Sequence, residues 1–352
     1  MIHPILEKIT RSARHTTFYL SCGPVRGAPV IFVHGWPELS ITWRHQLSVL
    51  GSLGFHAIAP DMRGYGRSSA PDSRAEYAVE NAVLDMCELL DHLGVERAIW
   101  VGHDWGSPVV WSLAQHHPDR RHGVVSLCAP YLPDGFALQS LLPHVDRSMY
   151  PEATFPLGQW AYFRYHLEAF DAGVASFEAD LVNTVRLLFR SGVPEDQARP
   201  SSTAFTLERG GFFGRRGRPP SLQRDPSVLT EVDESRYVAA LSRTGFRGPN
   251  SWYCNDEANL RYAASARGGT RIDLPVLFLH AAWDPNCDTV KSTLADPMRG
   301  HCSDLEEVVL QCGHWMAEEK PAEVNAALVR WLARRFSHLW TAKAPTASTA
   351  GS

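Results

Sequence analysis

The stretch VGHDWGSP, residues 101–108, places an aspartate in a tight turn that can carry chemistry. An apolar run ends at Val101 and a helical pattern begins soon after Asp104, so the turn joins a strand to a helix. Gly102 and Gly106 flank the turn where larger side chains would clash. The free N–H groups and the dipole at a helix N-terminus keep a carboxylate ionised, so Asp104 is a candidate nucleophile. Aspartate is also a common N-cap residue, which is the competing structural interpretation.

A second candidate group lies near the C-terminus, where the motif CGHW follows an apolar run. Its histidine, His314, is expected on a loop at the carboxyl end of a strand, as a general base. Such a base needs a carboxylate that holds its tautomer. Asp284, in LFLHAAWDPNCD at the end of the preceding apolar run, is the predicted partner. Asp134 and Asp288 are alternatives, because the carboxylate can come from the end of more than one strand.

Alternating strands and helices are predicted to position these groups. Short runs rich in Val, Ile, Leu and Phe suit strands buried on both faces of a parallel sheet, and they lie at residues 29–33, 56–59, 98–101, 124–128, 276–280 and 305–310. Apolar residues at helical spacing predict helices over residues 80–93, 109–114 and 322–339. The predicted fold class is therefore α/β, with a mostly parallel sheet flanked by helices.

The alternation stops after Pro130 and resumes near Leu274, which predicts a helical lid inserted between two strands. Helical pieces at residues 160–169 and 179–189 are broken by SGVPEDQARPSS and RGGFFGRRGRPPS, and no run between them is typical of a buried strand. The small, polar C-terminal tail is expected to be disordered. The predicted organisation is a core of residues 1–130 and 267–340, a lid of residues 131–266 and a disordered tail of residues 341–352.

The composition is that of a globular protein with a large core, since the 352 residues are 44% hydrophobic and 20% charged, with a net charge of −4. This balance gives no reason to expect nucleic acid or a membrane as partner. The basic cluster Arg215, Arg216 and Arg218 indicates a solvated loop. No run has the roughly 18 apolar residues of a membrane span, and no signal-peptide pattern is found, so a cytoplasmic protein is expected. The oligomeric state, monomer or homodimer, stays open.

The sequence predicts no metal, no other cofactor and no disulfide framework. The seven cysteines are scattered and never spaced as CxxC, so they are predicted to be reduced and mostly buried. The histidines form no HExxH motif, and the adjacent His116 and His117 cannot share one helix face as metal ligands would.

The motifs HGWPE at 34–38, DMRGYGRS at 61–68, GHDWGS and CGHW together resemble the epoxide hydrolases of the α/β-hydrolase fold, over nearly all of the chain. The resemblance implies that the backbone N–H groups of Trp36 and Trp105 form an oxyanion hole. It also implies that Glu38 helps to position water or His314, although a solvated loop carboxylate fits that position equally well. A Trp36-Pro37 bond in such a turn can be cis.

The same resemblance implies that two tyrosines of the lid bind the epoxide oxygen. The motifs WAYFRYH and PNSWYCN assign these roles to Tyr162 and Tyr253, with Tyr165 as the alternative to Tyr162. A phenol stays protonated at neutral pH and can donate a hydrogen bond to the alkoxide that ring opening produces.

The expected reaction is hydrolysis of a small apolar epoxide to a vicinal diol through an ester on Asp104. A serine would form a stable ether on attacking the epoxide carbon, whereas an aspartyl ester can be hydrolysed with the help of His314. A haloalkane dehalogenase is the alternative, because GHDWG occurs there too, but Trp36 stands where those enzymes often have Asn. A fluoroacetate dehalogenase would have arginine in place of Trp105. A non-catalytic, ligand-binding relative is the remote alternative.

Overall fold

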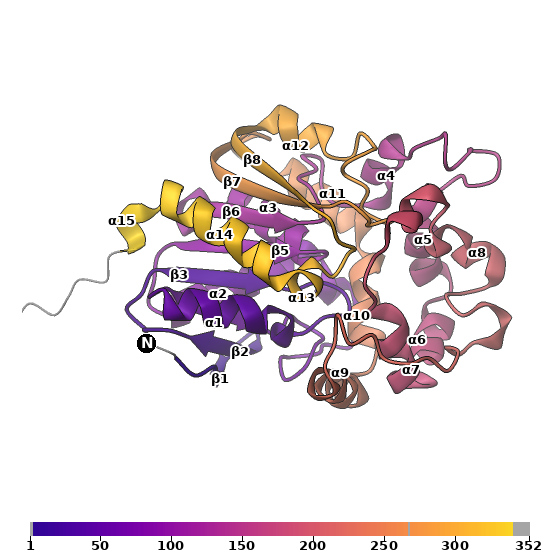
Figure 1. Cartoon of the computed structure of the whole chain (residues 1–352), viewed down its shortest axis with the longest axis horizontal. Coiled ribbons are helices and arrows are strands. Elements are labelled where there is room, and N and C mark those ends of the chain that lie inside the picture. The colour runs from indigo at the N-terminus through magenta and orange to yellow at the C-terminus, as the bar shows by residue number, and fades with distance from the viewer. Residues whose placement is uncertain (1–2, 267, 341–352) are drawn as a thin grey trace, which may run out of the picture.

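A computed structural model describes residues 3–266 and 268–340, and its centre is an eight-stranded sheet (Figure 1). The strand order is β1-β2-β4-β3-β5-β6-β7-β8. Six strands run parallel, and they are β3 (Pro29–Val33), β4 (His56–Pro60), β5 (Ala98–His103), β6 (Arg121–Leu127), β7 (Ile272–Ala281) and β8 (Cys302–Leu310). The predicted α/β fold with a mostly parallel sheet is confirmed. The predicted disordered tail, residues 341–352, lies outside the described residues.

Two N-terminal strands extend the sheet beyond the predicted ones. Strands β1 (Leu6–Arg11) and β2 (Thr16–Cys22) pair with each other antiparallel, and β2 pairs antiparallel with β4. The sequence LEKITR of β1 is almost entirely exposed at the edge of the sheet, so it has no buried run to detect. Strand β2 is buried but contains Thr17 and Ser21, which interrupt its apolar pattern.

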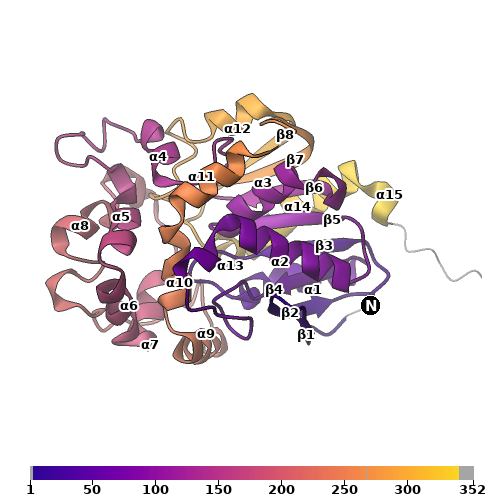
Figure 2. The ribbon, with the colours of Figure 1, turned by 180° about the vertical axis from the view of Figure 1, so that it is seen from behind.

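Helices cover both faces of the sheet (Figures 1 and 2). Helices α1 (Arg44–Ser52) and α14 (Pro321–Arg335) pack against each other on one face, and α2 (Val79–His92) packs against α3 (Gly106–His116) on the other. The helix predicted over residues 322–339 is wrong at its end, because Phe336 leaves the helical conformation, with φ −131° and ψ 31°. The short helix α15 (Ser337–Trp340) follows it.

Between β6 and β7 the chain forms a set of helices that we call the helical insertion, residues 138–264. Its α-helices are α4 (Leu138–Leu141), α5 (Ala161–Glu168), α6 (Phe170–Glu178), α7 (Leu181–Leu188), α8 (Thr206–Arg209), α9 (Glu231–Thr244), α10 (Arg247–Ser251) and α11 (Asp256–Ala264). Within residues 128–266, all of them described, no strand forms. The helical insertion stands at one end of the sheet, beyond the loops that follow the parallel strands (Figure 1).

A local sequence motif sets the start of α9, the longest helix of the insertion. The Thr230 hydroxyl accepts a hydrogen bond from the Asp233 amide at 3.1 Å, and the Asp233 carboxylate accepts one from the Thr230 amide at 3.1 Å. This reciprocal capping satisfies two N–H groups that would otherwise lack partners and begins α9 at Glu231.

The core lies on both sides of the parallel strands. The central residues of β3, β5 and β7 are fully buried, and Trp43, Trp100 and Trp331 fill the space between sheet and helices. All seven cysteines are free, five of them buried, as predicted. Across residues 3–266 and 268–340, none of the helices combines the length and apolarity that a bilayer span requires.

Candidate active site

Asp104 occupies a strained turn at the end of β5. Its φ of 49° lies in the left-handed region, which only a few non-glycine residues adopt. The neighbouring glycines allow the turn, because a Cβ on Gly106 would lie 2.1 Å from the carbonyl oxygen of Val33 and one on Gly102 would lie 2.6 Å from that of Gly106. Helix α3 starts at Gly106, so the Asp104 carboxylate stands at a helix N-terminus, as the sequence predicts.

His314 lies between two carboxylates. Its Nδ1 is 2.5 Å from Asp284 Oδ2, and its Nε2 is 3.5 Å from Asp104 Oδ2. Asp284 is fully buried, and its other oxygen accepts hydrogen bonds from the amides of Asn286 at 2.9 Å and Cys287 at 3.1 Å. These bonds orient the carboxylate toward the imidazole. The arrangement brings the predicted nucleophile, base and orienting acid within contact distance of one another.

The two alternative acids point elsewhere. Asp134 is exposed and lines a separate cavity together with Leu132 and His144. The carboxylate of Asp288 accepts hydrogen bonds from the amides of Val290 and Lys291, at 3.1 and 2.8 Å, and so closes a surface turn. Of the three candidates, Asp284 is the one that contacts His314.

The charges of this group stabilise one another. Burial would lower the pKa of His314, but the charge of Asp284 and the hydrogen bonds to Asp104 and Asp284 hold it well above its usual value. Burial would raise the pKa of Asp104, but the hydrogen bond and the charge of His314, the charge of His103 and the amide of Trp36 keep it below its usual value. The two pKa shifts together favour an ionised Asp104 beside a protonated His314.

The loop after β3 brings a backbone donor to the carboxylate of Asp104. The Trp36 amide donates a hydrogen bond of 2.7 Å to Asp104 Oδ1. The loop can approach so closely because residue 35 is glycine, where a Cβ would lie 2.4 Å from Asp104 Oδ1 and 2.6 Å from the Trp105 nitrogen. The Trp36-Pro37 peptide bond is cis. Gly35 thus adjoins the amides of both predicted oxyanion donors, Trp36 and Trp105.

Glu38 is buried and bonded within the site. Its Oε2 accepts a hydrogen bond from the Gly35 amide at 2.7 Å and contacts His103 Nδ1 at 2.8 Å. His103 Nε2 in turn lies 2.9 Å from the carbonyl oxygen of His314. Burial would lower the pKa of His103, but the charge of Glu38 holds it well above its usual value, so both ring nitrogens donate. The buried pair of Glu38 and His103 thus connects the loop after β3, the end of β5 and the loop of His314.

The contribution of His103 was not among the sequence predictions, although it immediately precedes the nucleophile. A second group that the sequence analysis missed is Cys128, whose φ of 66° is also left-handed. Its thiol lies 3.4 Å from the carbonyl oxygen of His314. A polar side chain directly before the nucleophile was the available signal for His103, whereas no local pattern marks Cys128.

Tyr162 and Tyr253 come together on the insertion side of the site. Tyr162 belongs to α5 and Tyr253 to the short 3-10 helix η9 (Trp252–Cys254), and their ring centroids are 5.5 Å apart. Both line the same cavity as Asp104 and His314. Tyr165 does not line this cavity. Its hydroxyl instead lies against Gly211, where a Cβ would be 2.7 Å from the hydroxyl oxygen.

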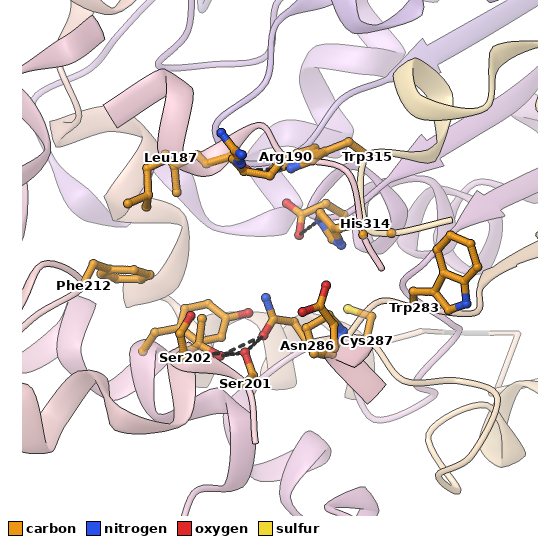
Figure 3. Close-up of a pocket in the computed structure, with 18 of the residues that line it drawn as sticks. Leu187, Arg190, Ser201, Ser202, Phe212, Trp283, Asn286, Cys287, His314 and Trp315 are labelled. Carbon is orange, nitrogen blue, oxygen red and sulfur yellow. Dashed lines mark hydrogen bonds and ion pairs between the residues drawn. The ribbon is translucent and has the colours of Figure 1, made fainter. Parts of the chain in front are cut away.

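The cavity has a volume of about 690 Å³ and lies between the helical insertion and the loops that follow the strands. In Figure 3, Leu187 and Arg190 lie on one side, Ser201, Ser202 and Asn286 on the opposite side, and His314 between them. Asn286 Oδ1 accepts hydrogen bonds from the hydroxyls of Ser201 and Thr203, at 2.8 Å each. The Gln197 side chain donates to the Asp284 carbonyl oxygen at 2.9 Å, so the insertion is anchored to the loop that carries the acid.

Metal-ligating side chains cluster around His314 in two ways. One group is His103, Cys128 and His314, and the other is Asp284, Cys287 and His314. In the second group, Nδ1 of His314 already bonds to Asp284 at 2.5 Å, so a cation would have to break that bond. The expectation that the chain needs no metal stays a prediction.

Comparisons with known proteins agree with this fold. A family model described as alpha/beta hydrolase fold matches residues 28–321. Epoxide hydrolase A of Mycobacterium tuberculosis is 34% identical over 316 residues, which cover 87% of this chain and 91% of that protein. Bifunctional epoxide hydrolase 2 of Sus scrofa is 34% identical over 311 residues and 87% of this chain, but these cover 51% of its own length, so the chain spans about half of that protein. The crystal structure of epoxide hydrolase A from Mycobacterium thermoresistibile matches with a TM-score of 0.76 and 31% identity, covering 94% of this chain and 98% of that one.

Proposed function

Because this chain belongs to the epoxide hydrolases of the α/β-hydrolase fold, we propose that it forms a vicinal diol in two steps, through an ester on Asp104. The observation that carries this proposal is the meeting of three groups in one cavity. These are an ionised aspartate, a histidine 3.5 Å from it, and two tyrosines of the helical insertion.

In the first step, a carboxylate oxygen of Asp104 attacks an epoxide carbon and the carbon–oxygen bond of the ring breaks. The released alkoxide accepts hydrogen bonds from Tyr162 and Tyr253 and takes a proton from one of them. Burial, with nearby groups including Asp104 adding to it, raises the pKa of both phenols well above the usual value. The phenols therefore stay protonated until the alkoxide forms.

In the second step, His314 must act as a neutral base. Once Asp104 is an uncharged ester, His314 loses one of its two carboxylate partners, and its proton passes to the phenolate left by the first step. His314 then takes a proton from water, and the hydroxide attacks the ester carbonyl while the Trp36 and Trp105 amides stabilise the oxyanion. The departing diol oxygen takes the second proton of that water, and Asp104 and the imidazolium are restored.

The charge dependence of His314 gives the first prediction. Replacing Asp104 with alanine should lower the pKa of His314, because the pKa is raised in part by the hydrogen bond to Asp104. The shift can be measured by following the ring signals of isotopically labelled histidines in an NMR titration, with exposed His92 as reference. A pKa of His314 that stays in place would mean that Asp104 does not control the base.

The epoxide and haloalkane reactions differ in the leaving atom, oxygen or halogen, that hydrogen-bond donors in the cavity must stabilise. The indole N–H of Trp36 donates to Asn250 Oδ1 at 3.2 Å, so this side chain is not free to hold a halide. The pair of cavity-lining tyrosines instead suits an alkoxide. We therefore favour the epoxide over the haloalkane reaction.

An assay on matched substrates tests the proposed function. A styrene-type epoxide, an aliphatic epoxide and a bulky epoxide are expected to yield diols, whereas 1-haloalkanes of similar length should release no halide above the rate of an Asp104→Ala control. Chromatography of the diols and halide titration measure the two outcomes. Halide release without diol would assign the chain to the dehalogenase reaction instead.

We also propose that residues 131–266 act as the lid of the active site, over a core of residues 1–130 and 267–340. The support is that the tyrosines come from the helical insertion while Asp104, Asp284 and His314 come from loops after β5, β7 and β8. The oxirane would be enclosed between the two parts, away from bulk water. A cytoplasmic location stays a prediction.

A further inference from the structure

The loop that carries His314 is held by its backbone on both sides of the histidine. On one side, the carbonyl oxygen of His314 lies 2.9 Å from Nε2 of His103. On the other side, the amide of Gly313 donates a hydrogen bond of 2.9 Å to Oε2 of Glu319. Glu319 ends the short helix α13 (Met316–Glu319), which follows the loop directly. These contacts limit the directions in which the imidazole can leave the backbone.

The same oxygen of Glu319 also contacts the helical insertion. The amide of Gly192, in the loop after α7, donates a hydrogen bond to Oε2 of Glu319 at 3.2 Å. The two loops touch here, because a Cβ on Gly192 would lie 2.4 Å from Gly313 Cα and one on Gly313 would lie 2.5 Å from the Gly192 nitrogen. One carboxylate oxygen therefore joins the two loops at a contact that has no room for a side chain on either glycine.

A tryptophan adds a further contact between the same two segments. Nε1 of Trp315 donates a hydrogen bond of 2.7 Å to the carbonyl oxygen of Leu188, the last residue of α7, and its ring lies 4.6 Å from that of Phe189. Figure 3 shows Trp315 on the same side of the cavity as Arg190. Both rings of the pair are buried, so separating the segments would expose apolar surface to water.

The two tyrosines of the insertion are held by different contacts. Tyr162 lies on α5, directly after Trp160, whose Nε1 donates a hydrogen bond of 3.0 Å to the carbonyl oxygen of Asn286. The ring of Tyr253 packs against those of Tyr162 and Trp105, with centroids 5.5 and 5.2 Å apart. None of these contacts involves the carboxylate at the end of α13. Its loss should therefore disturb the histidine more than the phenols.

From this geometry we propose that Glu319 is a positioning residue for the hydrolysis of the ester, and that it makes the position of His314 depend on the insertion. Its Oε2 holds both the amide before the histidine and the amide of Gly192. The imidazole is thus directed at the ester only while the loop after α7 lies in place. The inference rests on the proposed function, in which His314 activates water after ring opening. Ring opening itself uses Asp104 and the tyrosines and does not depend on Glu319.

The size of the effect follows from how a misplaced base loses rate. A displacement of about 1 Å can cost about 10²-fold when a catalytic group must meet its target in one geometry. Glu319→Ala removes both hydrogen bonds, so ester hydrolysis should slow by roughly tenfold to hundredfold. Glu319→Gln keeps an oxygen that can accept both bonds, although a neutral acceptor binds more weakly than a carboxylate. It should recover part of the rate that alanine loses.

The test is a single turnover of a simple epoxide at saturating concentration, stopped by rapid quench and followed by mass spectrometry of the Asp104 peptide. The rise of the adduct gives the rate of ring opening, and its decay gives the rate of ester hydrolysis. Glu319→Ala should keep the rise at the wild-type rate and slow the decay. Because both rate constants come from one preparation, a loss of folded enzyme lowers the amplitude and changes neither constant.

Gly192→Ala tests the same contact from the side of the insertion. The added Cβ would meet Gly313 Cα, so it should push the loops apart and slow the decay as Glu319→Ala does. In the combined variant, the slowing should be smaller than the product of the two separate effects, since both changes break one contact. Glu323→Gln is the matched control, because Glu323 is exposed on α14 four residues after Glu319, and both of its rates should equal those of wild type.

Three results would overturn the inference. The first is decay at the wild-type rate in Glu319→Ala, and the second is equal slowing of rise and decay, which would indicate a general disturbance of the site. The third is a combined variant whose slowing equals the full product, because the two residues would then act independently. In each case, an adduct that forms and decays in wild type would leave the proposed function standing. If no adduct forms in any variant, His314→Gln included, the proposed function itself fails.

Discussion

Replacing His314 with glutamine is expected to stop the reaction after ring opening and to leave the substrate attached to Asp104. Glutamine keeps much of the side chain's size but cannot take a proton from water, so the ester persists. Loss of a general base should slow turnover by roughly 10²–10⁴-fold. Mixing the variant with a simple epoxide and digesting it should give an Asp104 peptide heavier by one substrate mass, which mass spectrometry detects.

The origin of the added oxygen provides a control on the same step. In a single turnover of the wild-type enzyme in heavy-oxygen water, the label should enter the Asp104 carboxylate rather than the diol, because water attacks the ester carbonyl. His92→Gln, an exposed substitution on α2, should turn over normally and carry no adduct. A His314→Gln enzyme with neither adduct nor diol would refute the covalent mechanism, as would label that enters the diol first.

The double variant Tyr162→Phe, Tyr253→Phe should lose epoxide opening. In the proposed mechanism each phenol donates a hydrogen bond to an oxygen that becomes charged in the transition state. Loss of one such donor typically costs about 10²–10³-fold in rate. The two losses together should exceed either alone and remove the rapid formation of the ester. Rapid-quench measurement of the Asp104 adduct checks this, because it isolates the first step.

A tyrosine on the same helix serves as the matched control. Tyr165→Phe should retain most of the activity, since the Tyr165 hydroxyl lies beside Gly211 and not in the cavity. Because the pKa of both active-site phenols is raised well above 10, the rate of ester formation should not fall as the pH increases toward that value. Ester formation at an unchanged rate in the double variant would mean that another group protonates the alkoxide.

Several features of this protein could be predicted because they depend on short stretches of sequence. The turn at Asp104 needs small residues on both sides, and apolar runs mark the strand before it and the strand before His314. Since the carboxyl ends of parallel strands meet at one edge of a sheet, the motifs at 34–38, 101–108 and 312–315 had to converge. The rule therefore predicted that the candidate nucleophile, the candidate base and the loop at 34–38 would lie together.

The choice among similar residues could not be made in the same way. Tyr162 and Tyr165 are three positions apart on α5 and point within about 60° of each other, so either could have faced the site. Asp284, Asp134 and Asp288 all follow predicted strands, and only the path of each loop decides which carboxylate reaches His314. The exposed strand β1 had no buried pattern to reveal it.

The sequence by itself indicated a carboxylate nucleophile, a histidine base and the strands that precede them, because each of these is a local pattern. Tertiary structure alone decided how distant groups combine. The ion pair of Glu38 with His103 and the contact of His103 with the His314 loop join segments up to 211 residues apart. Such contacts depend on how loops and helices pack against one another, which the periodicity of the sequence does not predict.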